Sequence, residues 1–339
     1  MAIKGRLGVR HDEDDGYGRP ARRTRPRTKD RPDYSGSETG YVVAVDRGRF
    51  TVLVDNDQGL RELSCTKARQ LGRKGVIVGD EVQVVGDTSG ADGTLARIVG
   101  VVERRSVLRR TADDDDPFER PIVANADQLA IVTALADPPP RPGMIDRILV
   151  AAYDAGLWPL LVLTKADLSS PDELSALYRD LDVTVLSTHP GSDLDELRDE
   201  LAGHRTVFVG HSGVGKSTLV NALIPDAGRA IGHVNQVTGR GRHTSTSAVA
   251  LQLPGGGWVI DTPGVRSFGL SHVTTDSIIA AFPDLADLVG DCPRACAHDT
   301  SAAQCALDAA VQRGDLASSR LESFRRMEKA WITPDHDLR

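Results

Sequence analysis

The arrangement of hydrophobic and polar residues changes character along the chain. Between residues 38 and 108, short runs rich in β-branched and aromatic residues, such as 40–45 and 49–54, are separated by short turns such as 46–48, which is typical of strands. Further strands are predicted at 76–85, 93–99 and 100–103. Roughly five short strands in about 70 residues predict a small barrel of the OB type.

From residue 126 onward, strand and helix patterns alternate. The apolar run 126–135 predicts a buried strand, 144–155 has helical periodicity and ends at Gly156, and 160–168 is again an apolar strand. Further helices are predicted at 171–178 and 194–201, strands at 183–186 and 207–209, and a hairpin at 249–253 and 258–261. This order predicts a parallel sheet flanked by helices, with ligands at the carboxyl ends of the strands.

Composition and charge narrow the class of protein. No apolar run approaches the length of a membrane span and the first residues lack an apolar signal sequence, so we expect a cytoplasmic protein without a membrane partner. Residues 1–31 hold ten Lys/Arg against five Asp/Glu, although the whole chain carries a net charge of −7. Such a basic tail binds RNA phosphates or simply stays solvated, and the sequence leaves both possibilities open.

The strongest motif is a glycine loop between a predicted strand and a predicted helix. Residues 210–217 fit the pattern G-x-x-x-x-G-K-S, in which backbone N–H groups wrap a triphosphate. Lys216 is predicted to reach the β- and γ-phosphates, and the Ser217 hydroxyl to bind Mg²⁺. The predicted nucleotide-binding residues here are Gly210, His211, Ser212, Gly213, Val214, Gly215, Lys216, Ser217 and Thr218.

Two shorter motifs also follow predicted strands. Asp261-Thr-Pro-Gly264 fits D-x-x-G, with Asp261 near Mg²⁺ and the Gly264 N–H at the γ-phosphate. Thr164, Lys165, Ala166 and Asp167 fit the element that reads guanine, and Ser187 begins a second loop on the base side. The Asp167 carboxylate would accept hydrogen bonds from two guanine N–H groups. Alone, this short match also fits a surface charge cluster.

The order of these motifs is unusual. In most GTPases the base-reading element follows the P-loop and D-x-x-G, whereas here it precedes both. Because the ends of a domain often lie close together, permutation of the chain preserves the sheet. The order therefore predicts a circularly permuted GTPase.

This combination resembles the RsgA (also called YjeQ) family of bacterial GTPases. The resemblance rests on the permuted order, the preceding barrel, the switch sequence Gly241-Arg-His-Thr-Ser-Thr246, the Asp-Thr-Pro-Gly-Val-Arg sequence and a late Cys/His cluster, and it covers roughly residues 38–330. It implies a GTPase that binds the small (30S) ribosomal subunit and its 16S rRNA late in assembly. It also implies stimulation by the subunit and release on hydrolysis.

The catalytic residue has to be found outside the usual position. Many GTPases place a Gln after D-x-x-G to orient water, but Val265 stands there and cannot hydrogen-bond. His243 is the candidate, and the resemblance supports it, although a solvent-facing loop histidine is the alternative. Thr244, Ser245 and Thr246 offer hydroxyls for Mg²⁺ and the γ-phosphate, and the pattern does not decide between them.

The late cluster predicts a structural zinc site. Cys292, Cys296, His298 and Cys305 form C-x3-C-x-H-x6-C, and three thiolates with one imidazole complete a tetrahedral Zn²⁺ shell. The resembled family has C-x4-C-x-H-x5-C, so the Cys-x-His pair is shifted by one residue. Reduced cysteines near a helix end are the alternative, and isolated Cys65 is expected to be a barrel core residue.

Taken together, the patterns predict a multi-domain α/β protein. We expect a basic tail at 1–37, an OB-type RNA-binding barrel at 38–110, a permuted GTPase domain at 111–272 and a helical zinc-binding domain at 273–339. The amphipathic stretch 316–331 predicts either an RNA-facing helix or a solvated face. Nothing demands a dimer, and we expect a monomer. A P-loop ATPase or kinase, and a protein that binds rRNA without hydrolysing GTP, are the competing hypotheses.

Overall fold

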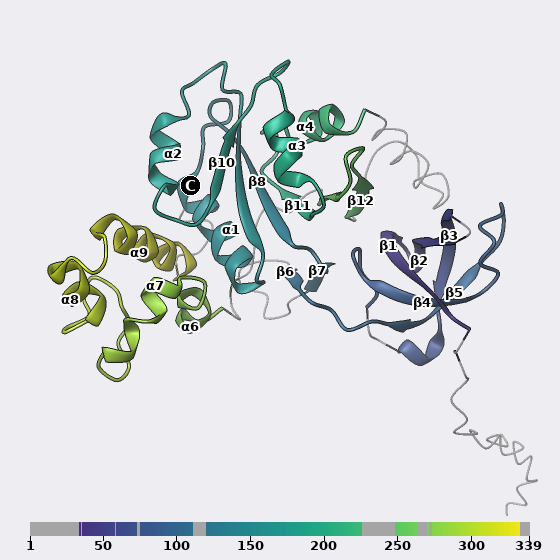
Figure 1. Ribbon diagram of the computed structural model, residues 1–339, viewed down its shortest axis with the longest axis horizontal. Helices are drawn as coiled ribbons and strands as arrows, with labels where there is room; N and C mark the ends of the chain where they lie inside the picture. The colour runs from purple at the N-terminus through teal and green to yellow at the C-terminus, as the bar shows by residue number, and fades with distance from the viewer. Residues whose placement is uncertain are drawn as a thin grey trace, which may run out of the picture. The chain divides into compact units, whose positions relative to one another are not determined.

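The structure is a computed structural model that describes residues 34, 36–57, 59–72, 75–110, 120–225, 248–262, 270 and 273–332 (Figure 1). The chain divides into two compact units, Met1–Ser35 and Gly36–Arg339, and nearly all described residues belong to the second. No helix within the described ranges is long and apolar enough to cross a membrane. The predicted domain boundaries stay predictions, since the barrel, sheet and C-terminal helices share one compact unit.

The first element is a closed barrel of five strands. These are β1 (Glu38–Asp46), β2 (Arg49–Asn56), β3 (Gly59–Lys67), β4 (Glu81–Gly86) and β5 (Ala96–Val101), and a single 3₁₀ turn, η1 (Arg69–Leu71), follows β3. The strands pair in the order β1-β2-β3-β5-β4, and β1 pairs with β4 to close the barrel. Its core holds Val42, Val52, Leu63, Cys65 and Ile98. The predicted OB-type barrel and the core position of Cys65 are confirmed.

Individual strands of the barrel differ from the sequence prediction. β3 was not predicted, because only Leu63 and Cys65 face inward and the other residues of the strand are mostly polar. The predicted strands 93–99 and 100–103 are the single strand β5, which continues through Gly100, and β4 begins only at Glu81. Glycine therefore signalled a break where the strand in fact continues.

After the barrel the chain forms a separate pair of strands. Its β6 (Val107–Arg110) pairs antiparallel with β7 (Arg120–Ala124), and the intervening Asp113–Asp116 lie outside the described residues. Arg104 donates to both carboxylate oxygens of the fully buried Asp80, at 2.6 and 2.9 Å. The charges of this stretch thus partly serve to hold the protein together.

The central sheet has the predicted parallel arrangement. Its strands follow the order β10 (Thr184–Ser187), β9 (Trp158–Thr164), β8 (Gln128–Ala134), β11 (Arg205–Val209) and β13 (Trp258–Asp261), all parallel, with β12 (Val249–Gln252) antiparallel at the end. β12 also pairs with β1 of the barrel, Ala44 opposite Val249. A parallel sheet joined by helical crossovers is the architecture that alternating strand and helix patterns predict.

Alternate residues of the strands face opposite sides of the sheet and pack against different helices. In β8, Leu129 and Ile131 join the core that contains α1 (Pro142–Asp154) and α2 (Asp172–Tyr178). Ala130 and Val132 face the core of α3 (Asp195–Leu201) and α4 (Lys216–Leu223). The sheet is therefore covered on both faces, as the near-continuous apolar run 126–135 predicted.

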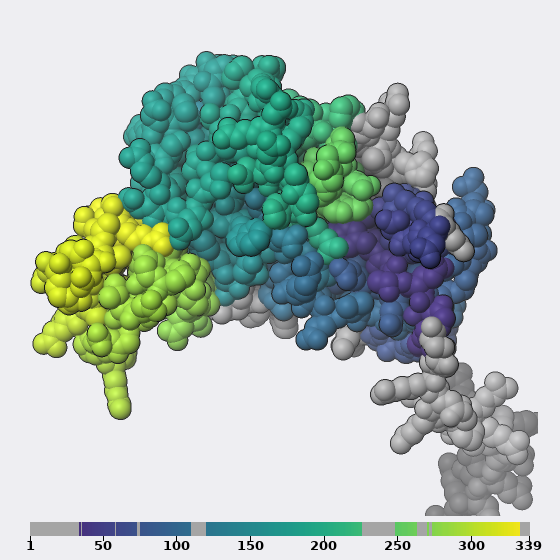
Figure 2. Space-filling view, viewed as in Figure 1, coloured from purple at the N-terminus to yellow at the C-terminus, as the bar shows by residue number. Residues whose placement is uncertain are grey.

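The C-terminal part is helical. It contains α6 (Thr275–Ile279), α7 (Pro283–Ala286), η2 (Val289–Asp291), α8 (Ala306–Arg313) and α9 (Ser318–Ile332), and the yellow α9 lies against the teal surface of α1 and α2 (Figures 1 and 2). The Trp331 indole Nε1 donates to the carbonyl of Leu270, at 3.0 Å.

The arginines of α9 bind acidic groups of the protein itself. Arg326 contacts the buried Asp146 of α1 at 3.0 Å, Arg325 contacts Asp308, and Arg320 contacts Asp284 and Asp182. The expectation that these side chains face RNA or solvent is wrong for these three residues, because each lies in an internal ion pair and is at most about a quarter exposed. An amphipathic pattern alone does not distinguish a solvated charged face from one that packs on acidic neighbours.

Candidate functional site

The predicted nucleotide-binding motifs meet at one edge of the sheet. The P-loop follows β11, Asp261 ends β13, the Thr164–Asp167 element follows β9 and Ser187 ends β10. These strands are parallel, so their carboxyl ends lie at the same edge, which is where open α/β sheets bind ligands. The permuted order in the chain therefore still produces a single site.

The backbone of the predicted P-loop depends on its glycines. A Cβ on Gly210 would lie 2.4 Å from the carbonyl oxygen of Val132 in β8, so only glycine allows this close approach. Gly213 and Gly215 have φ of +84° and +91°. α4 begins directly at Lys216, which directs the positive end of its dipole toward the loop.

The base-reading element is bonded directly to the P-loop. The Thr164 hydroxyl donates to the carbonyl of Val214 at 2.5 Å. The Lys165 ammonium group donates to the carbonyl of Asp137, and the Ala166 N–H donates to the carbonyl of Thr188 at 3.1 Å. The bond from Thr164 joins this element to the P-loop, and the other two bonds join it to the loops that follow β8 and β10.

The carboxylate that would read guanine remains accessible. Asp167 is exposed at the end of β9, and Ser187 is exposed at the end of the neighbouring strand. An exposed carboxylate next to a loop that is held by backbone bonds can accept two hydrogen bonds from the edge of a guanine base.

The phosphate side carries a compact charged pair. Lys216 and Asp261 form an ion pair, and their side chains are only 12% and 17% exposed. Thr262 is anchored by its hydroxyl, which donates to the carbonyl of Phe208 at 2.8 Å. Ser217 is exposed at the start of α4. An ammonium group that contacts phosphate oxygens, with a carboxylate and a hydroxyl near Mg²⁺, are the groups that bind a magnesium–triphosphate complex.

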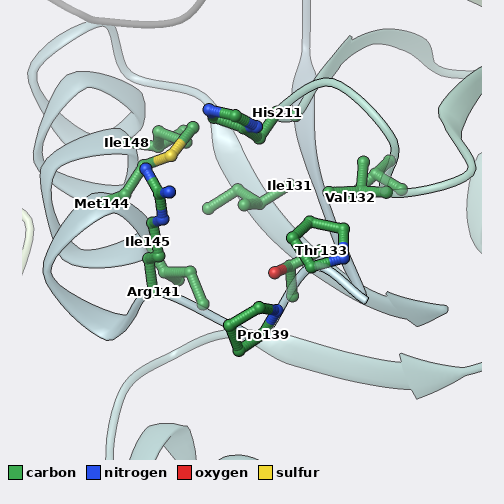
Figure 3. Close-up of a pocket in the computed structure, with 12 residues that line it drawn as sticks. Ile131, Val132, Thr133, Pro139, Arg141, Met144, Ile145, Ile148 and His211 are labelled. Atoms are coloured by element: carbon green, nitrogen blue, oxygen red, sulfur yellow. The ribbon is translucent and has the colours of Figure 1, made fainter. Parts of the chain in front are cut away.

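A pocket that is partly open to solvent adjoins the P-loop (Figure 3). Its walls are the end of β8, the first turns of α1 and the start of the P-loop, and His211 and Arg141 are among the few polar residues that line it. The His211 side chain therefore lies on the α1 side of the loop. His211 was predicted to bind nucleotide, and on this geometry its backbone is the part that can contribute to the phosphate cradle.

Several predicted site residues lie outside the described residues. These are His243, Thr244, Ser245, Thr246, Gly264 and Val265. The roles of the first five stay predictions from sequence.

The four predicted zinc ligands converge. The ligand atoms of Cys292, Cys296, His298 and Cys305 all lie within 4.8 Å of one another. The Nδ1 atom of His298 is 3.5 Å from the Cys292 sulfur and 3.7 Å from the Cys305 sulfur, and the two sulfurs are 4.0 Å apart. Tetrahedral zinc with ordinary bond lengths requires about 3.6 Å between sulfur and nitrogen and about 3.8 Å between sulfurs. The distances among Cys292, His298 and Cys305 thus match a Zn²⁺ shell, and the sulfur of Cys296 lies within 4.8 Å of these three atoms despite the shifted spacing.

The protonation states of the cluster also suit a metal. Burial lowers the pKa of His298, with a further contribution from Arg325, which favours the neutral imidazole that a metal needs. Burial raises the pKa of the Cys305 thiol to about 11, so a cation would be needed to hold it as thiolate at neutral pH.

α9 supports the zinc-site loop in a way that the sequence did not reveal. Arg325 donates to the backbone carbonyl of His298 at 2.8 Å and to that of Asp299 at 3.1 Å, while Asp308 of α8 holds its guanidinium group. No local motif marks Arg325, because its partners are 17 to 27 residues away. The cluster is thereby tied to the helix that packs on α1.

A buried carboxyl group in α9 gives a prediction about stability and pH. Burial, together with Asp299, raises the pKa of Glu328 to about 7 from an ordinary value of 4.5, while Arg325 opposes the change. The folded state therefore holds a proton between about pH 4.5 and 7 that the unfolded state releases, and stability falls as the pH rises through this range. Glu328→Gln is expected to be more stable than the wild type at pH 8, by up to about 3 kcal/mol, and nearly equal to it at low pH.

Denaturant unfolding at pH 5 and pH 8, at constant zinc, measures this difference. Glu322→Gln, an exposed position on the same helix, is the matched control and should show no such pH dependence. An equal stability difference for Glu328→Gln at both pH values would contradict the prediction.

Comparison with known proteins agrees with the geometry. Residues 101–271 match the RsgA GTPase family model. The chain is 40% identical over 304 residues to the small ribosomal subunit biogenesis GTPase RsgA of Pseudomonas aeruginosa (strain LESB58), which covers 87% of this chain and 86% of that protein. The corresponding protein of Ectopseudomonas mendocina is 39% identical over 307 residues, with 87% and 86% covered.

Solved structures give the same result. The crystal structure of YjeQ from Thermotoga maritima superposes with a TM-score of 0.65 at 27% identity, covering 87% of this chain and 99% of that one. YloQ, described as a circularly permuted GTPase, superposes with a TM-score of 0.63 at 23% identity, covering 88% and 96%, and supports the fold.

Proposed function

Because this chain belongs to the RsgA GTPase family, we propose that it hydrolyses GTP during the biogenesis of the small ribosomal subunit. The observation that carries the proposal is the convergence of the P-loop, Asp261 and the Thr164–Asp167 element at one sheet edge, with a hydrogen bond between Thr164 and Val214. We further propose that the 30S subunit and its 16S rRNA stimulate the reaction, late in subunit assembly.

The described residues have distinct roles in this proposal. Backbone N–H groups of 210–217 surround the phosphates, and Lys216 leaves Asp261 to contact the β- and γ-phosphates. Asp167 accepts hydrogen bonds from guanine, and Lys165 packs over the base. Ser217 and Asp261, with one of the hydroxyls at 244–246, would hold Mg²⁺, which when bound neutralises the charge that develops on the phosphate oxygens.

His243 is proposed to orient the attacking water. Its support is the sequence: Val265 has no hydrogen-bonding side chain, and an imidazole can bind water or relay a proton near neutral pH. The chemistry requires little more than positioning and electrostatic stabilisation, since the leaving group is already a good one.

Cys292, Cys296, His298 and Cys305 are proposed to hold one structural Zn²⁺ ion. Four protein ligands leave no position for substrate or water. The ion would therefore fix the loop between α7 and α8 and take no part in hydrolysis.

The proposal is tested by GTP turnover with and without purified 30S subunits, for wild type and His243→Ala. We expect subunits to accelerate turnover by the wild type, and His243→Ala to lose about 10²- to 10⁴-fold in the stimulated rate while its affinity for GTP is unchanged. His204→Ala, at the opposite end of the strands, is the matched histidine control and should behave as wild type. Turnover that does not respond to subunits would refute the ribosomal part of the proposal and leave a GTPase with another activator.

A further inference from the structure

We propose that strand β1 of the barrel positions Asp261 for Mg²⁺ and that Tyr41 of β1 is the positioning residue, which rests on the proposed function because Asp261 is taken to lie in the Mg²⁺ site. Tyr41 contacts the end of β13 opposite to the one that carries Asp261. β1 also lies outside residues 101–271, which match the family model. The nucleotide site would thus depend on a strand of a different part of the protein.

Strand β1 belongs to two hydrophobic cores. Val42 joins the barrel core, whereas Tyr41 and Val43 join the core that also holds Ala250 of β12 and Ile260 of β13. All five side chains are at most 9% exposed. Because alternate residues of a strand face opposite sides, one face of β1 fills the barrel and the other face packs toward the GTPase sheet.

Strand pairing connects β1 to Asp261 through a single residue. Ala44 of β1 lies opposite Val249, the first residue of β12, and Val249 lies opposite Asp261 of β13. Two strand spacings separate the Cα atoms of Ala44 and Asp261 by roughly 9–10 Å. Within the described ranges, β12 would be a four-residue edge strand without β1. Since short edge strands are weakly held, pairing with β1 restrains β12 directly beside Asp261.

The Tyr41 ring lies against the amino end of β13. Its centroid is 5.2 Å from that of Trp258, the first residue of β13. The guanidinium carbon of Arg205, which lies opposite Trp258 in the parallel pair, is 4.6 Å from the centre of the Tyr41 ring. Arg205 also contacts Glu81 of β4 at 3.0 Å. Tyr41 therefore joins the barrel to the amino end of the strand that carries Asp261.

These contacts restrain both ends of β13, and the position of Asp261 depends on that restraint. Asp261 ends the strand that Trp258 begins, so a shift of β13 along its axis moves the carboxylate relative to Lys216 and Ser217 of α4. Mg²⁺ demands near-ideal octahedral geometry, with ligands at about 2.0–2.1 Å. Loss of the Tyr41 ring is therefore expected to weaken Mg²⁺ binding although every ligand is still present.

The test measures GTP affinity of wild type and Tyr41→Leu over a range of Mg²⁺ concentrations and in a chelator, without ribosomal subunits. We expect Tyr41→Leu to need about 3- to 10-fold more Mg²⁺ for half-maximal GTP binding, less than the loss of about 10- to 100-fold that is typical of groups in contact with a metal ligand. Its affinity in the chelator should be unchanged.

Two control variants separate positioning from stability. Tyr41→Phe keeps the ring and should behave as wild type, because the Tyr41 hydroxyl has no hydrogen-bond partner in the part of the chain that is described. Phe50→Leu removes a buried ring from the barrel core and should lower stability to denaturant without changing the Mg²⁺ requirement.

A double-mutant cycle shows whether Tyr41 acts through Asp261. In an Asp261→Asn background, Tyr41→Leu should cause no further change in the Mg²⁺ requirement, because the carboxylate that it positions is absent. An unchanged requirement in Tyr41→Leu, an equal change in Phe50→Leu, or additive effects of Tyr41→Leu and Asp261→Asn would overturn the role of β1. Wild-type GTP binding that does not depend on Mg²⁺ at all would instead refute the proposed Mg²⁺ site, and the role of β1 with it.

Discussion

Asp167→Asn is expected to exchange guanine for xanthine specificity. The carboxylate lies exposed at the end of β9, next to a loop fixed by the Thr164–Val214 and Ala166–Thr188 hydrogen bonds. The asparagine oxygen can still accept from one guanine N–H group, but its NH₂ group then faces the other donor, and loss of one hydrogen bond to a carboxylate, worth about 1.5–3 kcal/mol, weakens GTP binding by at least roughly 10- to 100-fold. An asparagine amide can donate to the 2-carbonyl of xanthine, and affinity for xanthosine triphosphate should rise.

Equilibrium titration with GTP, xanthosine triphosphate and ATP measures this exchange. Asp199→Asn, an exposed aspartate of α3, is the matched control and should keep the preference for GTP. An Asp167→Asn variant that still prefers GTP would show that another residue reads the base. A wild type that prefers ATP would refute the assignment as a GTPase.

Removal of zinc is expected to disorder the C-terminal helices while nucleotide binding persists. Structural zinc sites contribute apparent binding free energies of about 10–16 kcal/mol in small peptides, which exceeds the stability of most helical segments of this size. Here the loop that holds His298 is also bonded to Arg325 of α9. Loss of the ion should therefore loosen α9 and with it the contact between Arg326 and the buried Asp146.

Cys305→Ser and chelation of the wild type should give the same result. We expect lost zinc by elemental analysis, reduced helical circular dichroism and faster proteolysis after residue 272, with GTP affinity changed less than about threefold. Cys65→Ser makes the same change in the barrel core and should lower stability without loss of zinc. Full helicity in a zinc-free protein would contradict a structural role for the ion.

The sequence by itself determined the features that depend on local chemistry. The P-loop, the Asp261 motif, the guanine-reading element and the four zinc ligands each combine a few residue types at fixed spacing, and a strand-helix pattern placed them at strand ends. The parallel sheet and the barrel were predicted from the local patterns of strands and helices, and the permutation from the order of the motifs. The shifted Cys-x-His spacing did not prevent convergence, because Ala295, His298 and Gln304 adopt positive φ and turn the loop toward the cluster.

The tertiary structure decided what depends on partners distant in the chain. β3 is a strand because its two inward residues, Leu63 and Cys65, complete the barrel core, although its polar composition gave no strand signal. The arginines of α9 bind Asp146, Asp308 and Asp284 instead of facing outward, and no sequence pattern reveals an acidic partner more than 15 residues away. Short sequence motifs determine local chemistry, whereas burial and ion pairing depend on which surfaces folding brings together.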